Sequence, residues 1–333
     1  MKTPILLIMF TRWSTLEKVF QQVKLAQPER LYLYQDGPRR ESYSEDMEGI
    51  NRCREIVSNI DWNCKVITKY MESNQGCDPG SYYAYKWFFS MEDKGIILED
   101  DAVASLSFFK YCEELLDRFE NNNLIYRICG ANVEGISNTG NSYFYSRKGS
   151  TGSWATWSRV AEMWDEHYSF LDNAEELRLL EKRFENHDYY NSWLKGAIAH
   201  KSTGVPYYET IFYENKIASG MLDVIPDRNL VTNIGLTNDA VHNNSLRFMP
   251  KAIKKYFNAE RYDLEFPLKH PDIIEENMHY TNSVNRMMGW GHPFLRTFRK
   301  FETAMKRLIL GNKEDRKYVF NKIKEITTYN NHE

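Results

Sequence analysis

Apolar and polar positions follow two alternating patterns along residues 1–130. Continuous apolar runs such as Ile5–Phe10 are typical of strands buried on both faces, and apolar residues three or four positions apart predict helices between them. Strands that alternate with helices favour an α/β fold, here a mostly parallel central sheet flanked by helices. The predicted strands cover residues 5–10, 31–34, 65–70, 95–98 and 124–129, and the predicted helices cover residues 14–27, 44–59, 82–91 and 105–119.

The carboxyl ends of three predicted strands carry polar side chains. Arg12 follows the first strand, Asp36 the second, and Glu99, Asp100 and Asp101 the fourth. In parallel α/β sheets, ligands bind at the carboxyl ends of the strands. We therefore expect these side chains to converge on one edge of the sheet and to form a binding site there.

The three consecutive acids Glu99–Asp101 need an offsetting charge, because like charges repel strongly in a low-dielectric cleft. A divalent cation supplies such a charge, and hard cations such as Mg²⁺ and Mn²⁺ bind carboxylate oxygens together with substrate phosphates. The cluster therefore predicts a metal site that handles a nucleotide diphosphate. The alternative is that one of these acids only caps the following helix.

The pattern changes in the second half of the chain. Residues 138–160 are rich in Gly, Ser and aromatic side chains, and one helix is predicted over residues 159–184. The C-terminal part reads as basic helices. The predicted domains are a catalytic domain over residues 1–250, divided into a nucleotide-binding half (1–135) and an acceptor half (136–250), and a helical extension over residues 251–333.

Charge is divided unevenly along the chain. The net charge is −3, but the segment from Asn285 to Glu325 holds eleven Lys and Arg against four Asp and Glu. Apolar residues at helical spacing, from Phe294 to Leu308, lie between these cations. The segment either packs as a helix pair on the catalytic domain or contacts an anionic membrane surface, as basic amphipathic helices do.

Composition excludes several classes of protein. The near-neutral charge argues against a nucleic-acid coat protein. The five cysteines include no C-x-x-C pair, which disfavours a zinc knuckle or a disulfide framework and favours a reducing compartment. The N-terminal apolar run is too short for a signal sequence, so we expect a cytoplasmic protein, with peripheral contact at the inner face of the membrane as a further option.

Several motifs in order along the chain resemble the GT-A-fold glycosyltransferases, and in particular the inverting N-acetylglucosaminyltransferase I group and its bacterial relatives. The opening strand with Arg12, the Gln35–Gly37 turn, the acids Glu99–Asp101, and the Gly152–Trp154 and Asp188–Trp193 stretches carry the resemblance. A further block, Arg228–Gly235, leads to His242 and is similar to one found in the bacterial relatives. The resemblance covers residues 1–245 and implies a GT-A-like fold.

On the donor side, the resemblance implies a nucleotide-sugar site with Mn²⁺ or Mg²⁺ as cofactor. Asp101 and His242 would bind the metal, and Glu99 and Asp100 would hold the ribose or a metal-bound water. The remaining two donor-side residues, which would contact the nucleotide base and ribose, are Arg12 and Asp36.

On the acceptor side, the resemblance implies that Asp188 is the general base on the acceptor hydroxyl, with Glu185 and Asp223 as alternatives. Trp154 and Trp193 are candidate acceptor-binding side chains, because flat aromatic rings match the C–H faces of hexoses. The structural alternative is that these aromatic rings belong to the core.

Together these features predict a hexosyltransferase that moves a sugar, with inversion, from a UDP-linked donor to a glycan or lipid-linked saccharide. Two other functions stay open. A sugar nucleotidyltransferase shares the metal–diphosphate chemistry but normally has a Gly-rich loop where this chain has Phe10–Trp13. A non-catalytic carbohydrate- or membrane-binding protein would use the acids only for structure.

Overall fold

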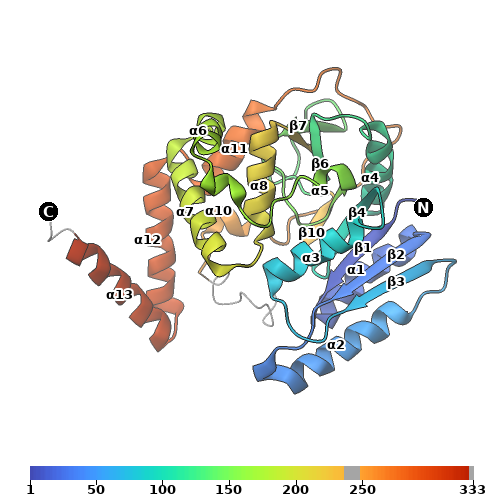
Figure 1. Cartoon of the computed structure of the whole chain (residues 1–333), viewed down its shortest axis with the longest axis horizontal. Helices are drawn as coiled ribbons and strands as arrows, with labels where there is room; N and C mark the ends of the chain where they lie inside the picture. Colours follow the sequence, from blue (N-terminus) through green and yellow to red (C-terminus); the bar gives the residue numbers. More distant parts are fainter. Residues whose placement is uncertain (236–247, 330–333) are drawn as a thin grey trace.

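A twisted sheet forms the centre of the protein (Figure 1). The computed structural model describes residues 1–235 and 248–329, with side chains described as far as residue 322. Within these residues the main sheet has eight strands in the order β3-β2-β1-β4-β8-β6-β9-β7. Its strands are β1 (Ile5–Met9), β2 (Arg30–Gln35), β3 (Lys65–Tyr70), β4 (Lys94–Glu99), β6 (Ile125–Cys129), β7 (Tyr143–Ser146), β8 (Trp154–Trp157) and β9 (Leu222–Pro226).

The first four strands of the sheet run parallel, as does the pair β6 and β9, whereas β8 and β7 are antiparallel to their neighbours. The predicted class, an α/β fold with a mostly parallel sheet flanked by helices and a helical C-terminal region, is confirmed. Apart from β3 at the edge of the sheet, whose residues are exposed or half-buried, the strands β1, β2 and β4 are largely buried apolar runs because helices cover both of their faces. Their carboxyl ends therefore meet at one edge of the sheet.

Two helical layers enclose the sheet. On one side α1 (Trp13–Ala26) packs against α2 (Tyr43–Ser58) and α4 (Leu106–Arg118), and on the other side α3 (Cys77–Phe89) packs against α8 (Tyr208–Ser219). Each of these helices turns a buried stripe toward the sheet, as expected for amphipathic surface helices. In α1 the stripe consists of Leu16, Val19, Phe20 and Val23, all at most 2% exposed.

The prediction of one helix over residues 159–184 is wrong. The segment folds as α5 (Ser158–Ala161), a 3-10 turn η2 (Ser169–Asp172) and α6 (Ala174–Arg183). Tyr168 adopts a left-handed backbone conformation (φ 52°), which a continuous helix cannot contain. The side chain of Asn173 then accepts hydrogen bonds from the backbone of Glu175 and Glu176 and starts α6 as an N-cap.

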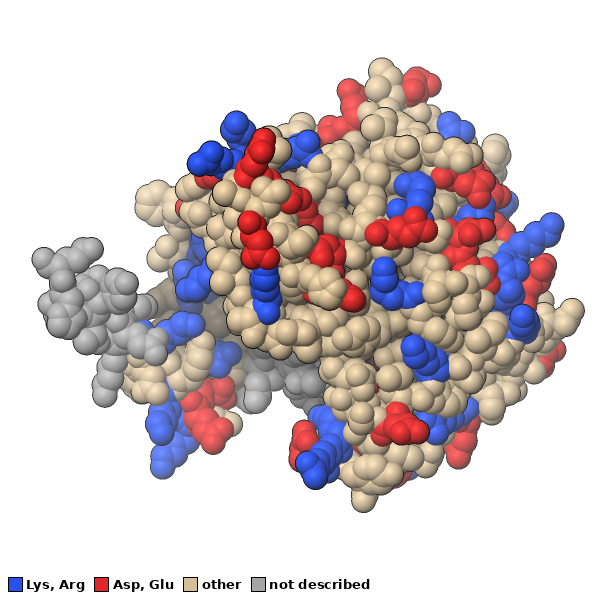
Figure 2. Space-filling view, in the orientation of Figure 1, with Lys and Arg blue, Asp and Glu red and all other residues tan. Residues whose placement is uncertain are grey.

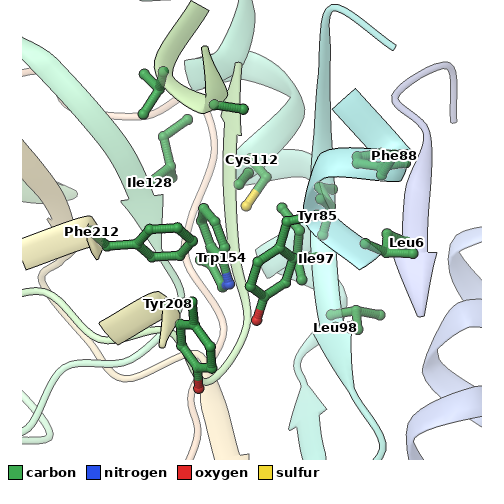
Figure 3. Close-up of a cluster of buried hydrophobic side chains, with 14 of the residues drawn as sticks. Leu6, Tyr85, Phe88, Ile97, Leu98, Cys112, Ile128, Trp154, Tyr208 and Phe212 are labelled. Carbon is green, nitrogen blue, oxygen red and sulfur yellow. The ribbon is translucent and has the colours of Figure 1, made fainter. Parts of the chain in front are cut away.

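Trp154 lies in the core, which corrects its expected role in acceptor binding. The side chain has no exposed surface. Its ring is surrounded by Tyr85 and Phe212, with ring centroids 5.3 and 5.6 Å away (Figure 3). No sugar can stack on a ring whose faces are already covered. Many of the chain's aromatic side chains lie in this interior, where edge-to-face ring pairs recur.

The C-terminal third lies across the body and then extends away from it. The backbone of Tyr262 bonds to Asn229, and that of Asn277 bonds to Tyr145 of β7. The helices here are α10 (Lys251–Lys254), α11 (Met278–Met288), α12 (Pro293–Leu310) and α13 (Lys313–Tyr329), and α12 and α13 form one end of the molecule (Figure 1). The division at residue 250 stays a prediction. None of the described helices is both long and apolar enough to cross a membrane.

Candidate functional site

The acids Asp100 and Asp101 form the turn between β4 and a short strand, β5 (Ala102–Ala104). β5 pairs in antiparallel fashion with β10 (Val231–Asn233), so that Asn233 lies opposite Ala102. This pairing holds Asp101 in place: its carbonyl accepts a hydrogen bond from Ile234 N (2.8 Å), and its Oδ1 accepts one from Asn233 Nδ2 (3.3 Å). A segment far along the chain therefore positions the acidic turn.

Arg12 supplies a counter-charge for both aspartates. Its guanidinium pairs with Asp101 at 2.6 Å and also with Asp100, whose Oδ2 accepts a further hydrogen bond from Phe10 N (3.1 Å). The expected convergence of the ends of β1 and β4 is confirmed. The structure places Arg12 between the acids, whereas the sequence resemblance implied contact with the nucleotide.

Asp100 is buried, which by itself raises the pKa of its carboxyl group, and neighbouring Asp101 raises that pKa further while Arg12 opposes the shift. The same balance acts on Arg12. Burial lowers the pKa of Arg12, but the two aspartates overcome this effect and raise it above its ordinary value. The three side chains thus form one ionic cluster in a low-dielectric setting.

Glu99, the last residue of β4, faces a cavity next to this cluster. Burial raises the pKa of Glu99, the charge of Asp101 raises it further, and Arg12 opposes both. No ion pair to Glu99 occurs within residues 1–235 and 248–322. Of the three acids, Glu99 is the one that lines the cavity.

Gly235 allows a loop to pass directly over Asp101. A Cβ atom at this position would lie 2.2 Å from Asp101 Oδ2, which is closer than any van der Waals contact. Only a residue without a side chain fits here while Asp101 keeps its place. The Arg228–Gly235 block singled out in the sequence thus ends in a glycine with a steric role beside the acids.

Asp36 follows β2 at the same edge of the sheet, but its carboxylate is used by its own loop. It accepts hydrogen bonds from the backbone of Gly37, Gln75 and Gly76 and from the side chain of Asn74, at 2.8–3.2 Å. This loop leads into α3, whose first residue is Cys77. Burial, together with the nearby charge of Glu99, raises the pKa of the Cys77 thiol to about 12. Asp36 therefore holds the start of α3 beside the acidic cluster.

A cavity of about 660 Å³ extends from Glu99 into the second half of the chain. Its walls come from the β7–β8 connection, from α7 (His187–Thr203) and α8, and from the segments around α10 and α11. A second hollow of about 520 Å³, beside Ser105 and Asp263, lies away from the acids. We place the site in the first cavity, whose principal polar and aromatic lining residues are Glu99, Arg127, Arg147, Lys148, Tyr189, Trp193, Glu209, Tyr213, Lys216, Asn233, Tyr256 and Trp290.

Several cationic side chains of this cavity are held in ion pairs with acids of the same chain. Asp223 pairs with both Arg127 (3.1 Å) and Lys216 and is fully buried. Lys148 pairs with Glu185 at 3.2 Å. Asp223 and Glu185, the alternative bases considered from the sequence, are thus engaged in ion pairs. Sequence reasoning missed these cations, because nothing in the local pattern marks which lysine or arginine pairs with a given acid.

The structure separates two candidates for the general base. Asp188 lies in the first turn of α7 with an exposed side chain, and it is not among the residues that line the cavity. Glu209 is also exposed, but it lies in the first turn of α8 and lines the cavity together with Glu99. Burial raises the pKa of Glu209, and the charge of Asp78 raises it further. Sequence reasoning missed Glu209 because no motif surrounds it.

Trp193 lines the cavity, although one face of its ring is stacked on Phe170 with the centroids 5.4 Å apart. Tyr189 and Trp290, stacked with centroids 4.4 Å apart, form another part of the wall. Trp290 belongs to the region predicted as a separate extension, so this region contributes to the site. His242 lies outside the described residues.

Oxygen donors predominate where a metal was predicted. Glu99 and Asp101 present carboxylates, and within the described part of the chain no three His, Cys, Asp or Glu side chains converge as a complete metal cage. Mg²⁺ in phosphate-handling sites is bound by one or two carboxylates, with water and substrate phosphates completing the shell. The donors present fit a hard cation of this kind, which would share Asp101 with Arg12.

Comparisons with known proteins identify no family. No family model matches the chain, and neither does any curated protein sequence. Among solved structures, similarity was found to HddC from Yersinia pseudotuberculosis (14% identity, 48% of this chain and 79% of that chain, TM-score 0.30). Similarity was also found to the glycosyltransferase GlyE of Streptococcus pneumoniae (13% identity, 56% of this chain and 40% of that chain, TM-score 0.29). A third similar structure is that of a glucose-1-phosphate thymidylyltransferase from Bacillus anthracis (12% identity, 52% of this chain and 76% of that chain, TM-score 0.30). Similarity at this level does not assign a function.

Proposed function

We propose that this protein is a metal-dependent glycosyltransferase that moves a hexose from a UDP-linked donor to a saccharide acceptor, free or lipid-linked. The observation that carries the proposal is the position of Glu99 and Asp101. Both lie at the carboxyl end of β4, the edge where α/β sheets bind their ligands, and Glu99 opens on a cavity large enough for a sugar.

In the proposed donor site, Glu99 and Asp101 would hold the cation, and Arg12 keeps Asp100 and Asp101 in position. When bound, Mn²⁺ or Mg²⁺ would neutralise the charge that develops on the departing diphosphate. The chain's own contribution is preorganisation. The β5–β10 pair, the Asn233 amide and Arg12 fix the Asp101 carboxylate before any substrate arrives.

In the proposed acceptor site, Glu209 is the general base. Its carboxylate would take the proton from the acceptor hydroxyl, and the oxygen would then form a bond to the anomeric carbon. The bond from that carbon to the diphosphate oxygen breaks, and its electron pair leaves with UDP. A carboxylate with a raised pKa is suited to this step, because general bases work best with a pKa near the working pH. The displacement inverts the anomeric configuration.

The nucleotidyltransferase alternative differs in its product. Such an enzyme would release pyrophosphate when it joins a nucleotide to a sugar phosphate, whereas a glycosyltransferase releases UDP. The loop after β1 favours transfer, because Arg12 is engaged with Asp100 and Asp101 and no Gly-rich phosphate loop precedes it. Product analysis that distinguishes pyrophosphate from UDP, carried out with both substrate types, separates the two reactions.

The decisive experiment is calorimetry of UDP binding with and without Mn²⁺. We expect wild-type protein to bind UDP more tightly with Mn²⁺, and Asp101→Asn, which keeps the shape of the side chain, to lose that dependence. Asp117→Asn is the matched control, because Asp117 is an exposed acid that pairs with Lys94 away from the cavity. Equal UDP affinity in wild type and Asp101→Asn, or no UDP binding by the wild type, would refute the proposal.

A further inference from the structure

The helix α12 turns its apolar face outward. Phe294, Phe298, Phe301 and Ile309 are 89%, 62%, 61% and 65% exposed, and Met305 between them is also exposed. At 3.6 residues per turn, these positions fall within an arc of about 100°, which is the width of the stripe that a globular helix normally buries. In α12 no residue is buried.

The polar face of the same helix is directed toward the body. Arg299 donates hydrogen bonds to the carbonyls of Met287 and Arg286 at the end of α11, and Lys306 donates one to the carbonyl of Met249 (2.8 Å). The guanidinium of Arg296 lies 4.8 Å from the ring centroid of Trp290. The polar contacts therefore fix the orientation of α12, and the apolar face is left as the outer surface.

Cations border this apolar face. Lys251, Lys254 and Lys255 are exposed at α10, which is linked to α12 by the bond from Lys251 N to Glu302. Lys313, Arg316 and Lys317 are exposed at the start of α13, which packs against α12. Residues 293–322 carry nine Lys and Arg against three Asp and Glu. By contrast, acids and bases are interspersed over the face of the body in Figure 2.

We propose that α12 binds the surface of an anionic lipid bilayer, with the three phenylalanines inserted at the level of the head groups. Aromatic and aliphatic side chains enter the interface, and bordering lysines reach the lipid phosphates. A second copy of the chain fits less well, because the two like-charged segments would repel each other when their apolar faces meet. Binding would hold the cavity, whose wall includes Met287 and Trp290 on the body side of α12, near the membrane, which suits a lipid-linked acceptor. This last consequence rests on the proposed function, whereas lipid binding does not.

The test is co-sedimentation of the full chain with vesicles of phosphatidylcholine alone or mixed with phosphatidylglycerol. We expect the wild type to bind only the mixed vesicles, and high salt to weaken the binding. The double variant Phe298→Glu/Phe301→Glu should bind at least about tenfold more weakly. Leu25→Glu is the matched control, since Leu25 is equally exposed (62%) on α1 but lies outside the proposed surface.

A second variant separates charge from apolar insertion. Lys251→Glu/Lys255→Glu should lose the preference for phosphatidylglycerol while UDP binding stays unchanged. The proposal is overturned if the wild type binds neither vesicle type, if it binds both equally, or if the phenylalanine variant binds as the wild type does. A wild-type dimer that the phenylalanine variant converts to a monomer, without vesicle binding, would overturn it in favour of self-association.

Discussion

Arg12 Nη1 lies 2.6 Å from Asp101 Oδ2, so the first helix begins with a cation directed into the acidic turn after β4. The sequence alone predicts that a metal offsets the charge of these acids. In the structure Arg12 already offsets part of their charge. A cation bound at Asp101 would therefore compete with Arg12 for the Asp101 carboxylate or share it with Arg12, and this relationship can be measured.

Removing Arg12 should make the protein less stable but more responsive to metal. We expect Arg12→Ala to lower the free energy of unfolding by about 2–3 kcal/mol at pH 7, because it leaves Asp100 and Asp101 unpaired. Added Mn²⁺ should recover part of that loss and should stabilise the variant more than the wild type. Urea unfolding with and without Mn²⁺ measures both effects. Arg39→Ala, which breaks the pair with Asp46, is the control, and an equal response of the two variants to Mn²⁺ would contradict a cation site at Asp101.

A side chain at Gly235 should displace Asp101. Because a Cβ there would lie 2.2 Å from Asp101 Oδ2, we expect Gly235→Ala to weaken Mn²⁺-dependent UDP binding by about tenfold or more, as changes beside metal ligands do. Gly196→Ala is the control, since no atom lies within 4 Å of a Cβ at that position. Calorimetry that shows unchanged affinity for Gly235→Ala would mean that the position of Asp101 does not matter for binding.

The choice between Glu209 and Asp188 as the base can be decided by kinetics. We expect Glu209→Gln to lower kcat by about 10²–10⁴-fold and to leave UDP affinity unchanged, because only the proton transfer is lost. Asp188→Asn should retain a kcat close to that of the wild type, since Asp188 lies outside the cavity lining. Steady-state rates of UDP release measure both. The reverse ranking would restore the assignment implied by the sequence resemblance.

The buried ion pairs of Asp223 should make stability depend on pH. Burial alone would raise the pKa of Asp223, but Arg127 and Lys216 overcome this effect and hold it below its ordinary value. As the pH falls, Asp223 is therefore protonated in the unfolded chain before it is protonated in the folded protein. The stabilisation from its ion pairs is complete above about pH 4 and is lost as the pH falls through the folded-state pKa. Asp223→Asn should lower the free energy of unfolding by about 3 kcal/mol or more at pH 7, since two cations then lose their partner.

Urea unfolding of the wild type and Asp223→Asn between neutral and acidic pH tests this dependence. The difference between the two proteins should shrink as the pH falls below about 4. Asp117→Asn, which removes an exposed partner of Lys94, should change stability by less than about 1 kcal/mol at every pH. A difference for Asp223→Asn that does not vary with pH would show that Asp223 is not charged in the folded protein.

Local pattern predicted the strands and most of the helices of the first half of the chain. Apolar runs and helical spacing depend on neighbours within a few residues, so β1, α1, β2 and α4 could be identified without a structure. The same reasoning failed between residues 159 and 184, where a single left-handed residue, Tyr168, divides an otherwise helical pattern. It also could not distinguish a buried Trp154 from an exposed one, because burial depends on Tyr85 and Phe212.

The sequence by itself determined the α/β class, the acids at the end of β4 and their approach to Arg12, because parallel strands bring their carboxyl ends to one edge. Only the tertiary structure decided which side chains share the cavity. Glu209, Lys148 and Trp290 are more than 50 residues apart from one another and come together through packing of α8, a loop and the C-terminal segment. The outward apolar face of α12 has the same origin. An amphipathic pattern predicts a helix, but the contacts of Arg299 and Lys306 decide which face it turns to solvent.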